Sequence, residues 1–161
     1  MKLPRTGIGF DVHRLEKGNE LFLGGISIPS DLQAVGHSDA DVLLHAIADA
    51  LLGAAALGDI GGHFPDNDPA YKNIYSGEIL KEVANMLYYQ GYEIGNVDAV
   101  VALQKPKLSP HIQNIRASIA EILQQPLSNV SVKATTTEKL GFIGREEGIA
   151  AYATTLIFEK A

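Results

Sequence analysis

The stretch HSDADVLLHAIADALLG, residues 37–53, predicts the helix around which the rest of the fold is arranged. Asp41, His45 and Asp49 stand four residues apart, and side chains at that spacing share one face of a helix. The other positions are mostly Val, Leu, Ile and Ala, so we expect a largely buried helix with one polar stripe. Ser38, three residues before Asp41, indicates a capping arrangement at the helix start. Because buried polar groups are costly without partners, other segments must supply partners for the stripe.

Composition limits the classes of function. The chain has 161 residues, 46% of them hydrophobic and 20% charged, which is typical of one globular domain with a sizeable core. Its net charge of −6 argues against nucleic-acid and membrane partners, since both need a basic surface. The absence of cysteine excludes thiolate metal sites, so a metal would be held by His, Asp or Glu. No stretch resembles a signal peptide or a membrane span, and we expect a cytoplasmic protein.

The remaining pattern predicts strands and helices in an α+β arrangement. Residues 5–13 alternate in polarity and indicate a strand that places Asp11 and His13 on one face. Residues 29–36 are expected to form a polar loop, and residues 57–69 a long connection of the kind that is often functional. The other expected elements are a hairpin over 21–28 that turns at Gly24-Gly25, helices over 76–90 and 109–123, and strands over 96–103, 130–136 and 149–158.

This element order favours a two-layer sandwich in a single domain, residues 1–161. We expect a mixed four-stranded sheet with helices on one face, together with the small β-hairpin. The strands are apolar on both sides, so part of the second face is expected to pack against another subunit.

A metal site is predicted from three separated residues. Asp11 and His13 on one strand can present a carboxylate and an imidazole to the same point, and His45 can reach it from the helix. Three such ligands with a vacant fourth position are typical of catalytic zinc. Two His and one carboxylate also bind non-haem iron, and a surface turn with a core histidine would need no metal at all. Asp49 could orient His45 from behind.

A second group of polar residues follows the strand expected over 130–136. Three consecutive threonines, Thr135–Thr137, precede Glu138 and Lys139, a combination that suits hydrogen bonding to phosphate oxygens. A carboxylate there could hold a hard cation such as Mg²⁺ together with those oxygens, whereas the alternative is a solvated threonine-rich turn. The turn over 104–107, QKPK, has the same two interpretations.

The long connection carries carboxylates that could bind a polyol. Asp59, Gly61, Asp66 and Asp68 either contact hydroxyl groups or form local turns. A calcium loop is excluded because Tyr71 stands where an EF-hand requires glycine.

Taken together, these motifs closely resemble the 2-C-methyl-D-erythritol 2,4-cyclodiphosphate synthase family. The likeness runs from about residue 5 to residue 159 in matching order. Its motifs are GFDVH over 9–13, HSDAD over 37–41, HAIADALLG over 45–53, GDIG over 58–61, FPDND over 64–68 and KATTTEKLGFIGR over 133–145.

The resemblance implies an enzyme that forms a cyclic diphosphate from 4-diphosphocytidyl-2-C-methyl-D-erythritol 2-phosphate, with release of CMP, in non-mevalonate isoprenoid biosynthesis. It implies Zn²⁺ on Asp11, His13 and His45, and Mg²⁺ or Mn²⁺ on Glu138. His37 and Thr136 would stabilise the transition state. It implies substrate contacts at Asp11, Val12, His13, His37, Ser38, Asp59, Ile60, Gly61, Phe64, Pro65, Asp66, Asn67, Asp68, Leu103, Gln104, Lys105, Pro106, Lys107, Leu108, Ser109, Thr135, Thr136, Thr137, Glu138, Phe142 and Arg145.

Within these contacts, the resemblance assigns residues 59–68 to a loop closing over the erythritol, 103–109 to the cytidine and 135–138 to its diphosphate. Family members are homotrimers with sites between subunits. Asn67 stands where Thr is frequent in the family. The rival interpretations are a non-haem iron oxygenase, which leaves the threonine-rich stretch unexplained, and a non-catalytic trimer that binds a nucleotide or an isoprenoid diphosphate.

Overall fold

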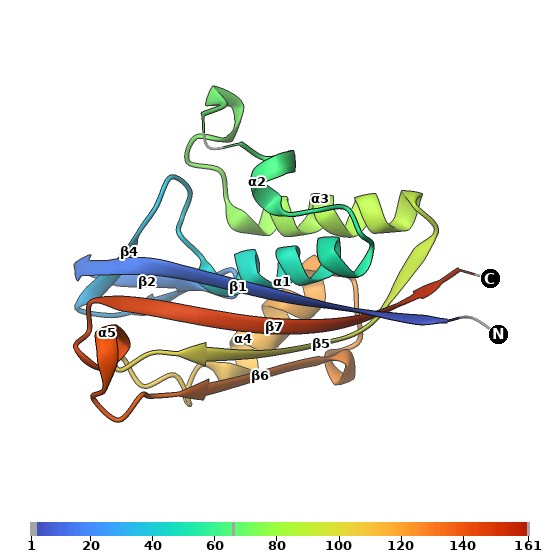
Figure 1. Ribbon diagram of the computed structural model, residues 1–161. Coiled ribbons are helices and arrows are strands. Elements are labelled where there is room, and N and C mark those ends of the chain that lie inside the picture. The colour runs from blue at the N-terminus through green and yellow to red at the C-terminus, as the bar shows by residue number, and fades with distance from the viewer. Residues whose placement is uncertain (1–2, 66, 161) are drawn as a thin grey trace.

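A five-stranded mixed sheet forms the centre of the fold in the computed structural model, which describes residues 3–65 and 67–160 (Figure 1). The strands lie in the order β4-β1-β7-β5-β6, antiparallel except for the parallel pair β5–β6. Their bounds are β1 Pro4–Lys17, β4 Leu32–Val35, β5 Tyr92–Ala102, β6 Val130–Thr135 and β7 Gly148–Glu159. The predicted α+β class is confirmed.

The sheet has one strand more than the four expected, because residues 32–35 are not a polar loop. They form β4, which pairs antiparallel with Arg14–Lys17 at the end of β1. The polarity of residues 29–36 was misleading, since a short edge strand with an exposed face needs few apolar residues. The predicted hairpin is confirmed as β2 Glu20–Leu23 and β3 Ile26–Pro29, a separate two-stranded sheet.

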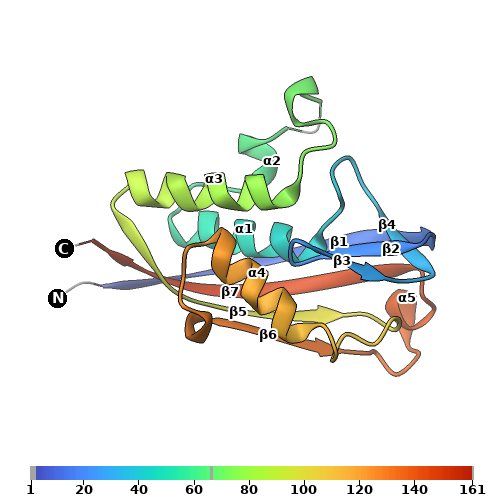
Figure 2. The ribbon, with the colours of Figure 1, turned by 180° about the vertical axis from the view of Figure 1, so that it is seen from behind.

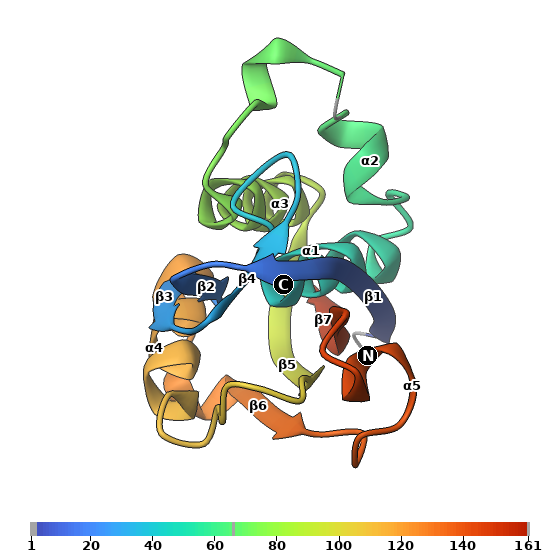
Figure 3. The same cartoon turned by 90° about the vertical axis from the view of Figure 1, so that its left-hand side faces the viewer.

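Helices cover one face of the sheet. Figure 2, which views the molecule from behind, shows α4 in front of the strands and lying across them, and Figure 3 shows α1 between β1 and α3. The helices are α1 Val42–Ala54, α2 Ile60–His63, α3 Ser76–Tyr89, α4 Ile112–Ile122 and α5 Gly141–Gly144, with 3-10 turns η1 Pro69–Tyr71 and η2 Leu127–Asn129. The longest, α3, has 14 residues, and within the described ranges no helix has the length and hydropathy to cross a membrane.

Helix α1 is buried on nearly all sides and rests directly on β1. Gly7 and Gly9 make this contact possible: a Cβ on Gly7 would lie 1.9 Å from the carbonyl oxygen of Ala50, and one on Gly9 would lie 1.8 Å from that of Ala46. No larger residue fits between this strand and the helix backbone. The glycines therefore set the distance between the two elements that carry the predicted metal ligands.

The cap of α1 differs from the expected one. Asp41, not Ser38, is the N-cap, and its side chain accepts a hydrogen bond from the Leu44 N–H. The same fully buried carboxylate accepts from the backbone N–H groups of Gly24 and Gly25 in the β2–β3 turn. Asp41 thus joins the hairpin turn to the start of α1.

On the second face of the sheet, Ile143 of α5 packs with Ala102 and Ala150 at one end, while much of the rest of this face stays exposed in the described part of the chain. Large apolar side chains on β1 and β7 are exposed there: Ile8 72%, Phe10 48%, Val12 43% and Tyr152 47%. The rings of Phe10 and Tyr152 pack together with their centroids 4.8 Å apart. An apolar patch of this kind is typical of an interaction surface.

Candidate metal centre and adjoining cavities

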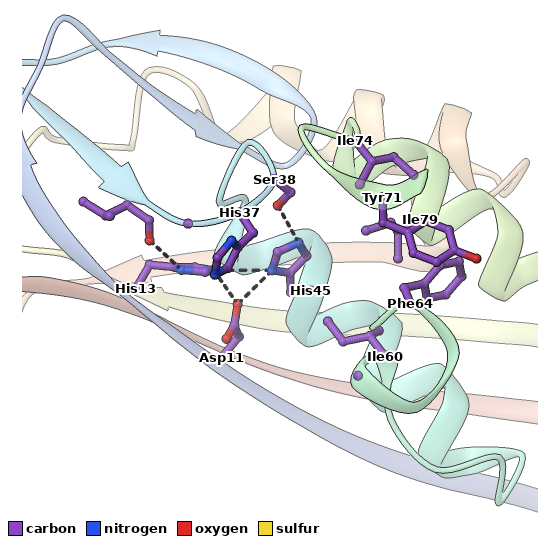
Figure 4. Close-up of a pocket in the computed structure, with 13 residues that line it drawn as sticks. Asp11, His13, His37, Ser38, His45, Ile60, Phe64, Tyr71, Ile74 and Ile79 are labelled. Atoms are coloured by element: carbon purple, nitrogen blue, oxygen red, sulfur yellow. Dashed lines mark hydrogen bonds and ion pairs between the residues drawn. The ribbon is translucent and has the colours of Figure 1, made fainter. Parts of the chain in front are cut away.

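Asp11, His13 and His45 meet as the sequence predicted (Figure 4). The Asp11 Oδ2 atom lies 3.0 Å from His13 Nε2 and 3.1 Å from His45 Nδ1, and the two nitrogens are 3.4 Å apart. Asp11 and His13 share the face of β1 that is turned toward α1, because they are two residues apart on an extended strand. His45 lies in the first turn of α1.

Each imidazole has a hydrogen-bond partner on the nitrogen that points away from the triad. His13 Nδ1 lies 3.1 Å from the Val35 carbonyl oxygen, which can only accept, so Nδ1 carries a proton and Nε2 is the nitrogen turned toward the triad. His45 Nε2 lies 2.8 Å from the Ser76 hydroxyl. Metal-binding histidines in proteins are normally held in this way.

The electrostatics of the triad favour an ionised carboxylate. Burial alone would raise the pKa of Asp11, but hydrogen bonds and charge from His13 and His45 lower it to about 2. Burial likewise acts to lower the pKa of His13, and the hydrogen bond and charge of Asp11 outweigh it and raise that pKa. The three side chains therefore form a site that attracts a cation, proton or metal.

The triad fits a divalent metal ion. A tetrahedral ion about 2.0–2.2 Å from each ligand would space the ligand atoms by about 3.3–3.6 Å, close to the 3.0–3.4 Å found here. The open side faces a cavity of about 510 Å³. The cavity is lined by Asp11, His13, Val35, Gly36, His37, Ser38, His45, Ile60, Gly61, Phe64, Tyr71, Ile74 and Ile79. A bound ion would thus have room for a substrate at its fourth position.

The connection over 57–69 forms one wall of this cavity. Asp59 caps α2 by accepting from the Gly62 N–H at 3.0 Å, and Asp68 caps η1 by accepting from the Ala70 N–H at 2.9 Å. Phe64 packs edge-on against Tyr71, with 5.4 Å between the ring centroids. Ile60 and Gly61 line the cavity, and Asn67 is exposed. Pro65 is partly buried beside Phe64, and Asp66 lies outside the described residues.

Asp49 has a different partner from the one expected. Its carboxylate accepts a hydrogen bond from the Ile60 N–H at 2.8 Å, and so ties the connection to α1. Burial raises the pKa of Asp49, against the lowering effect of that hydrogen bond. The group that contacts His45 from behind is instead Ser76, the first residue of α3. Nothing in the spacing of the sequence connects residue 76 with residue 45, and only a serine at a helix start could have drawn attention to it.

The second predicted polar region is also assembled. The Leu103 N–H donates to the Thr135 carbonyl at 3.0 Å, and the Lys139 N–H donates to Gln104 Oε1 at 3.1 Å. The two turns enclose a second cavity of about 390 Å³. Its lining residues are Leu103, Gln104, Pro106, Lys107, Leu108, Ser109, Ile112, Ala134, Thr135 and Thr136. Thr137 and Glu138 follow directly, and Glu138 is exposed with a left-handed backbone, φ 53°.

Several cations near this second cavity already face carboxylates. Lys105 lies 3.2 Å from Glu146, and Arg145 lies 2.9 Å from Glu147. An anionic ligand that uses these side chains must draw them away from their acidic partners. Phe142 of α5 lies on another side, where it lines a third cavity with Val12 and His13.

The two predicted catalytic residues are not brought together within one chain. His37 lines the cavity at the metal triad, whereas Thr136 lines the cavity at the end of β6. Both cavities lie at the end of the sheet where β1, β5 and β6 finish. The first cavity is at β1 and the second is at β6, and β7 and β5 lie between these two strands.

Comparisons with known proteins place the chain in a family. Residues 4–158 match the model of the YgbB family. A relative from Bacillus mycoides, named 2-C-methyl-D-erythritol 2,4-cyclodiphosphate synthase, is 56% identical over 156 residues, or 97% of this chain and 99% of the relative. A relative of the same name from Bacillus anthracis has the same identity and coverage.

Solved structures are also similar over nearly the whole chain. The bifunctional IspDF from Campylobacter jejuni superposes with a TM-score of 0.95 and 43% identity, and covers 99% of this chain, which spans 43% of that longer protein. IspF from Plasmodium falciparum, solved as a CDP complex, gives a TM-score of 0.86 and 37% identity, with 98% of this chain and 97% of that one covered. The chain therefore belongs to the YgbB family, and it is similar over nearly its whole length to relatives named 2-C-methyl-D-erythritol 2,4-cyclodiphosphate synthase.

Proposed function

We propose that the protein converts 4-diphosphocytidyl-2-C-methyl-D-erythritol 2-phosphate into 2-C-methyl-D-erythritol 2,4-cyclodiphosphate with release of CMP, as a phosphorus–oxygen lyase of non-mevalonate isoprenoid biosynthesis. The observation that carries this proposal is the Asp11–His13–His45 triad, which opens onto a cavity large enough for a small phosphorylated polyol. Membership of the YgbB family over residues 4–158 supports the choice of substrate.

The reaction is an internal phosphoryl transfer. An oxygen of the 2-phosphate attacks the diphosphate phosphorus nearer the erythritol, the bond from that phosphorus to the CMP oxygen breaks, and CMP leaves. The obstacles are repulsion between anions and the orientation of the two groups, so positioning and charge neutralisation supply most of the catalysis. When bound by Asp11, His13 and His45, Zn²⁺ would polarise the phosphoryl group under attack.

The chain's own residues would position the polyol. His37 and Ser38 line the cavity beside the triad and would donate hydrogen bonds to the 2-phosphate. Ile60, Gly61 and Phe64 would hold the erythritol from the opposite wall, with the cap of Asp59 keeping α2 in place.

The second cavity would receive the cytidine end of the substrate. Backbone groups of residues 103–109 would contact the nucleoside, and the hydroxyls of Thr135 and Thr136 would donate to its diphosphate. Glu138, exposed beside them, would hold Mg²⁺ or Mn²⁺ together with the diphosphate oxygens. A hydrogen bond from Thr136 to the moving phosphoryl group would complement the contact from His37.

We propose a homotrimer in which neighbouring copies complete each site. One argument is the exposed apolar patch of Ile8, Phe10, Val12 and Tyr152. The other is that His37 and Thr136 line different cavities, so one substrate reaches both only if a second copy brings its β6 end to the triad of the first. A heterologous contact that closes on itself forms a ring, as a trimer requires. Light scattering should give a mass three times the 17.2 kDa of one chain.

The activity is tested by incubating the purified protein with the diphosphocytidyl substrate and measuring CMP by chromatography. We expect CMP release that depends on a divalent metal, and loss of release in His45→Ala with the oligomer intact. Iron in the purified protein together with dioxygen uptake would support the oxygenase instead. Binding of CDP without any CMP release from the substrate would support the non-catalytic alternative.

Shared sites are tested by mixing two inactive variants. His37→Ala and Thr136→Ala should each lose activity, and random reassembly of equal amounts should restore about a quarter of the wild-type rate, since each site takes one face from each neighbour. Recovery would be absent if a single chain contained the whole site.

A further inference from the structure

We propose that Asp39 and Ser76 form a positioning relay that holds His45 in the one tautomer able to bind a metal at the triad. The inference rests on the proposed metal site. It adds two residues that lie outside the triad and outside the cavity lining.

The relay begins at a buried hydroxyl. Ser76 is fully buried at the start of α3, and its Oγ lies 2.8 Å from His45 Nε2. The same hydroxyl donates a hydrogen bond to the Asp39 carboxylate. His45 is itself only 8% exposed, so solvent does not readily replace this contact.

The direction of the hydrogen bonds decides the tautomer. A serine hydroxyl has one proton, and a carboxylate can only accept, so the Ser76 hydroxyl donates its one hydrogen bond to Asp39. Toward His45 the Ser76 oxygen is therefore an acceptor, and His45 Nε2 must carry the imidazole proton. Nδ1 is then the nitrogen turned toward the triad, 3.1 Å from Asp11 Oδ2 and 3.4 Å from His13 Nε2. In a doubly protonated ring Nδ1 donates to the Asp11 carboxylate, whereas in a ring protonated on Nε2 alone it offers its lone pair to a metal. Without Asp39, the hydroxyl could turn and donate to Nε2, which would place a proton on Nδ1 inside the triad.

Asp39 is fixed by contacts on both of its oxygens. Oδ2 accepts from the Ser76 N–H at 2.9 Å, which satisfies a free N–H at the start of α3, and Oδ1 accepts from the Asp41 N–H at 3.2 Å. These contacts connect the loop before α1 with the start of α3. The Asn73 N–H, which donates to the His37 carbonyl at 3.1 Å, ties the same two segments together.

Ser38 is the competing partner for His45. Its Oγ lies 3.4 Å from His45 Nε2, 0.6 Å farther than that of Ser76, and it also accepts from the Ala40 N–H at 3.2 Å. Ser38 faces the cavity, where solvent or substrate can engage its hydroxyl. The buried Ser76 is therefore the residue that holds the ring.

The first experiment measures the Zn²⁺ affinity of the metal-free protein by titration against a competing chelator. Loss of a hydrogen bond behind a metal-binding histidine typically costs 10–100-fold in affinity, and we expect this loss in Ser76→Ala and in Asp39→Asn. Ser118→Ala, a serine-to-alanine change in α4 away from the triad, is the matched control and should bind as the wild type does.

The second experiment reads the tautomer directly. Long-range ¹H–¹⁵N spectra of the metal-free protein are recorded in an Asp11→Ala background, where no carboxylate faces Nδ1, and are assigned with His45→Gln. In a neutral His45 ring the proton should lie on Nε2 when residues 39 and 76 are unchanged. Asp39→Asn should move it to Nδ1, because the amide can donate to Ser76 and the hydroxyl can then donate to His45. A role limited to the stability of α3 would change the melting temperature and leave the tautomer unaltered.

The outcomes separate the relay from the metal site. If the wild-type protein fails to bind Zn²⁺, the proposed function fails, while the tautomer shift in Asp39→Asn still supports the relay. If the wild type binds and both variants bind equally well with His45 protonated on Nε2, the relay is wrong. A tautomer that responds to Ser38→Ala and not to Ser76→Ala would also overturn it.

Discussion

The substitution Gly9→Ala tests whether the close contact between β1 and α1 positions the metal site. A Cβ at residue 9 would lie 1.8 Å from the Ala46 carbonyl oxygen and 2.8 Å from the Ala50 nitrogen, both of them backbone atoms. Separations under 3.0 Å are essentially never found for Cβ atoms, so strand and helix must separate by about 1.2 Å, the difference between 1.8 and 3.0 Å. Overpacking of this kind typically costs about 1–3 kcal/mol of stability.

The same shift disturbs the triad, because His45 directly precedes Ala46 on α1 and Asp11 is two residues from Gly9 on β1. Metal sites tolerate ligand distances within about 0.2 Å, far less than the displacement required. We therefore expect Gly9→Ala to lower Zn²⁺ affinity at least tenfold, on the order seen when ligand orientation is disturbed. The affinity is measured by chelator competition and the stability by urea unfolding of the metal-free protein.

Gly53→Ala is the matched control. Gly53 lies on α1, but the nearest atom to its added Cβ would be the Ile8 carbonyl oxygen at 3.8 Å, an ordinary contact. Replacing glycine by alanine at this exposed helix position should stabilise the folded protein by about 0.5–1 kcal/mol without changing its metal affinity. The reasoning would be refuted if Gly9→Ala unfolded within about 0.5 kcal/mol of wild type and bound Zn²⁺ as tightly.

Further predictions concern charge and metal. Asp41→Ala removes the acceptor of three backbone N–H groups, those of Gly24, Gly25 and Leu44, and should cost about 3 kcal/mol or more in urea unfolding, whereas Asp31→Ala on the surface should change little. In the metal-free protein the pKa of Asp11 is lowered from 3.8 to about 2. Its ionisation therefore contributes about 2 kcal/mol to the free energy of unfolding above pH 4, and this contribution is lost as the pH falls through 2. The same pH dependence of stability in Asp11→Asn would contradict this. The raised pKa of His13 acts in the opposite sense. Protonated His13 stabilises the folded protein fully below pH 6.5, the ordinary pKa, and this stabilisation disappears as the pH rises through the pKa in the folded protein. Zn²⁺ affinity should increase over the same range, because a histidine must be neutral to bind the metal. Addition of Zn²⁺ at a hundred times its dissociation constant should stabilise the folded protein by about 2.7 kcal/mol, and the melting temperature of His45→Ala should not respond.

The elements that the sequence predicted well are those with a strong local pattern. Alternation over residues 5–13 placed Asp11 and His13 on one face, and the apolar run after Asp41 indicated a buried helix. Gly24-Gly25 marked the β2–β3 turn, where both residues have positive φ, 65° and 82°. In each case the physical cause lies within a few residues.

The errors arose where the deciding partner is distant in the chain. Residues 32–35 form a strand only because β1 extends past His13 to pair with them. Ser38 satisfied the local capping pattern, but Asp41 is the residue at the cap. Its buried carboxylate is stabilised there by two N–H donors from the β2–β3 turn. Asp49 is likewise oriented by the Ile60 N–H, a donor outside its helix.

By itself the sequence determined the chemistry available to this protein: carboxylate and imidazole ligands without cysteine, a buried helix with a polar stripe, and a threonine-rich turn after a strand. Tertiary structure alone decided how these groups act together. Two glycines let β1 approach α1 closely enough for Asp11 and His45 to meet, and the start of α3 brings Ser76 behind the imidazole. These are contacts between backbones and side chains more than thirty residues apart, and their distances are set by packing, which local patterns do not encode.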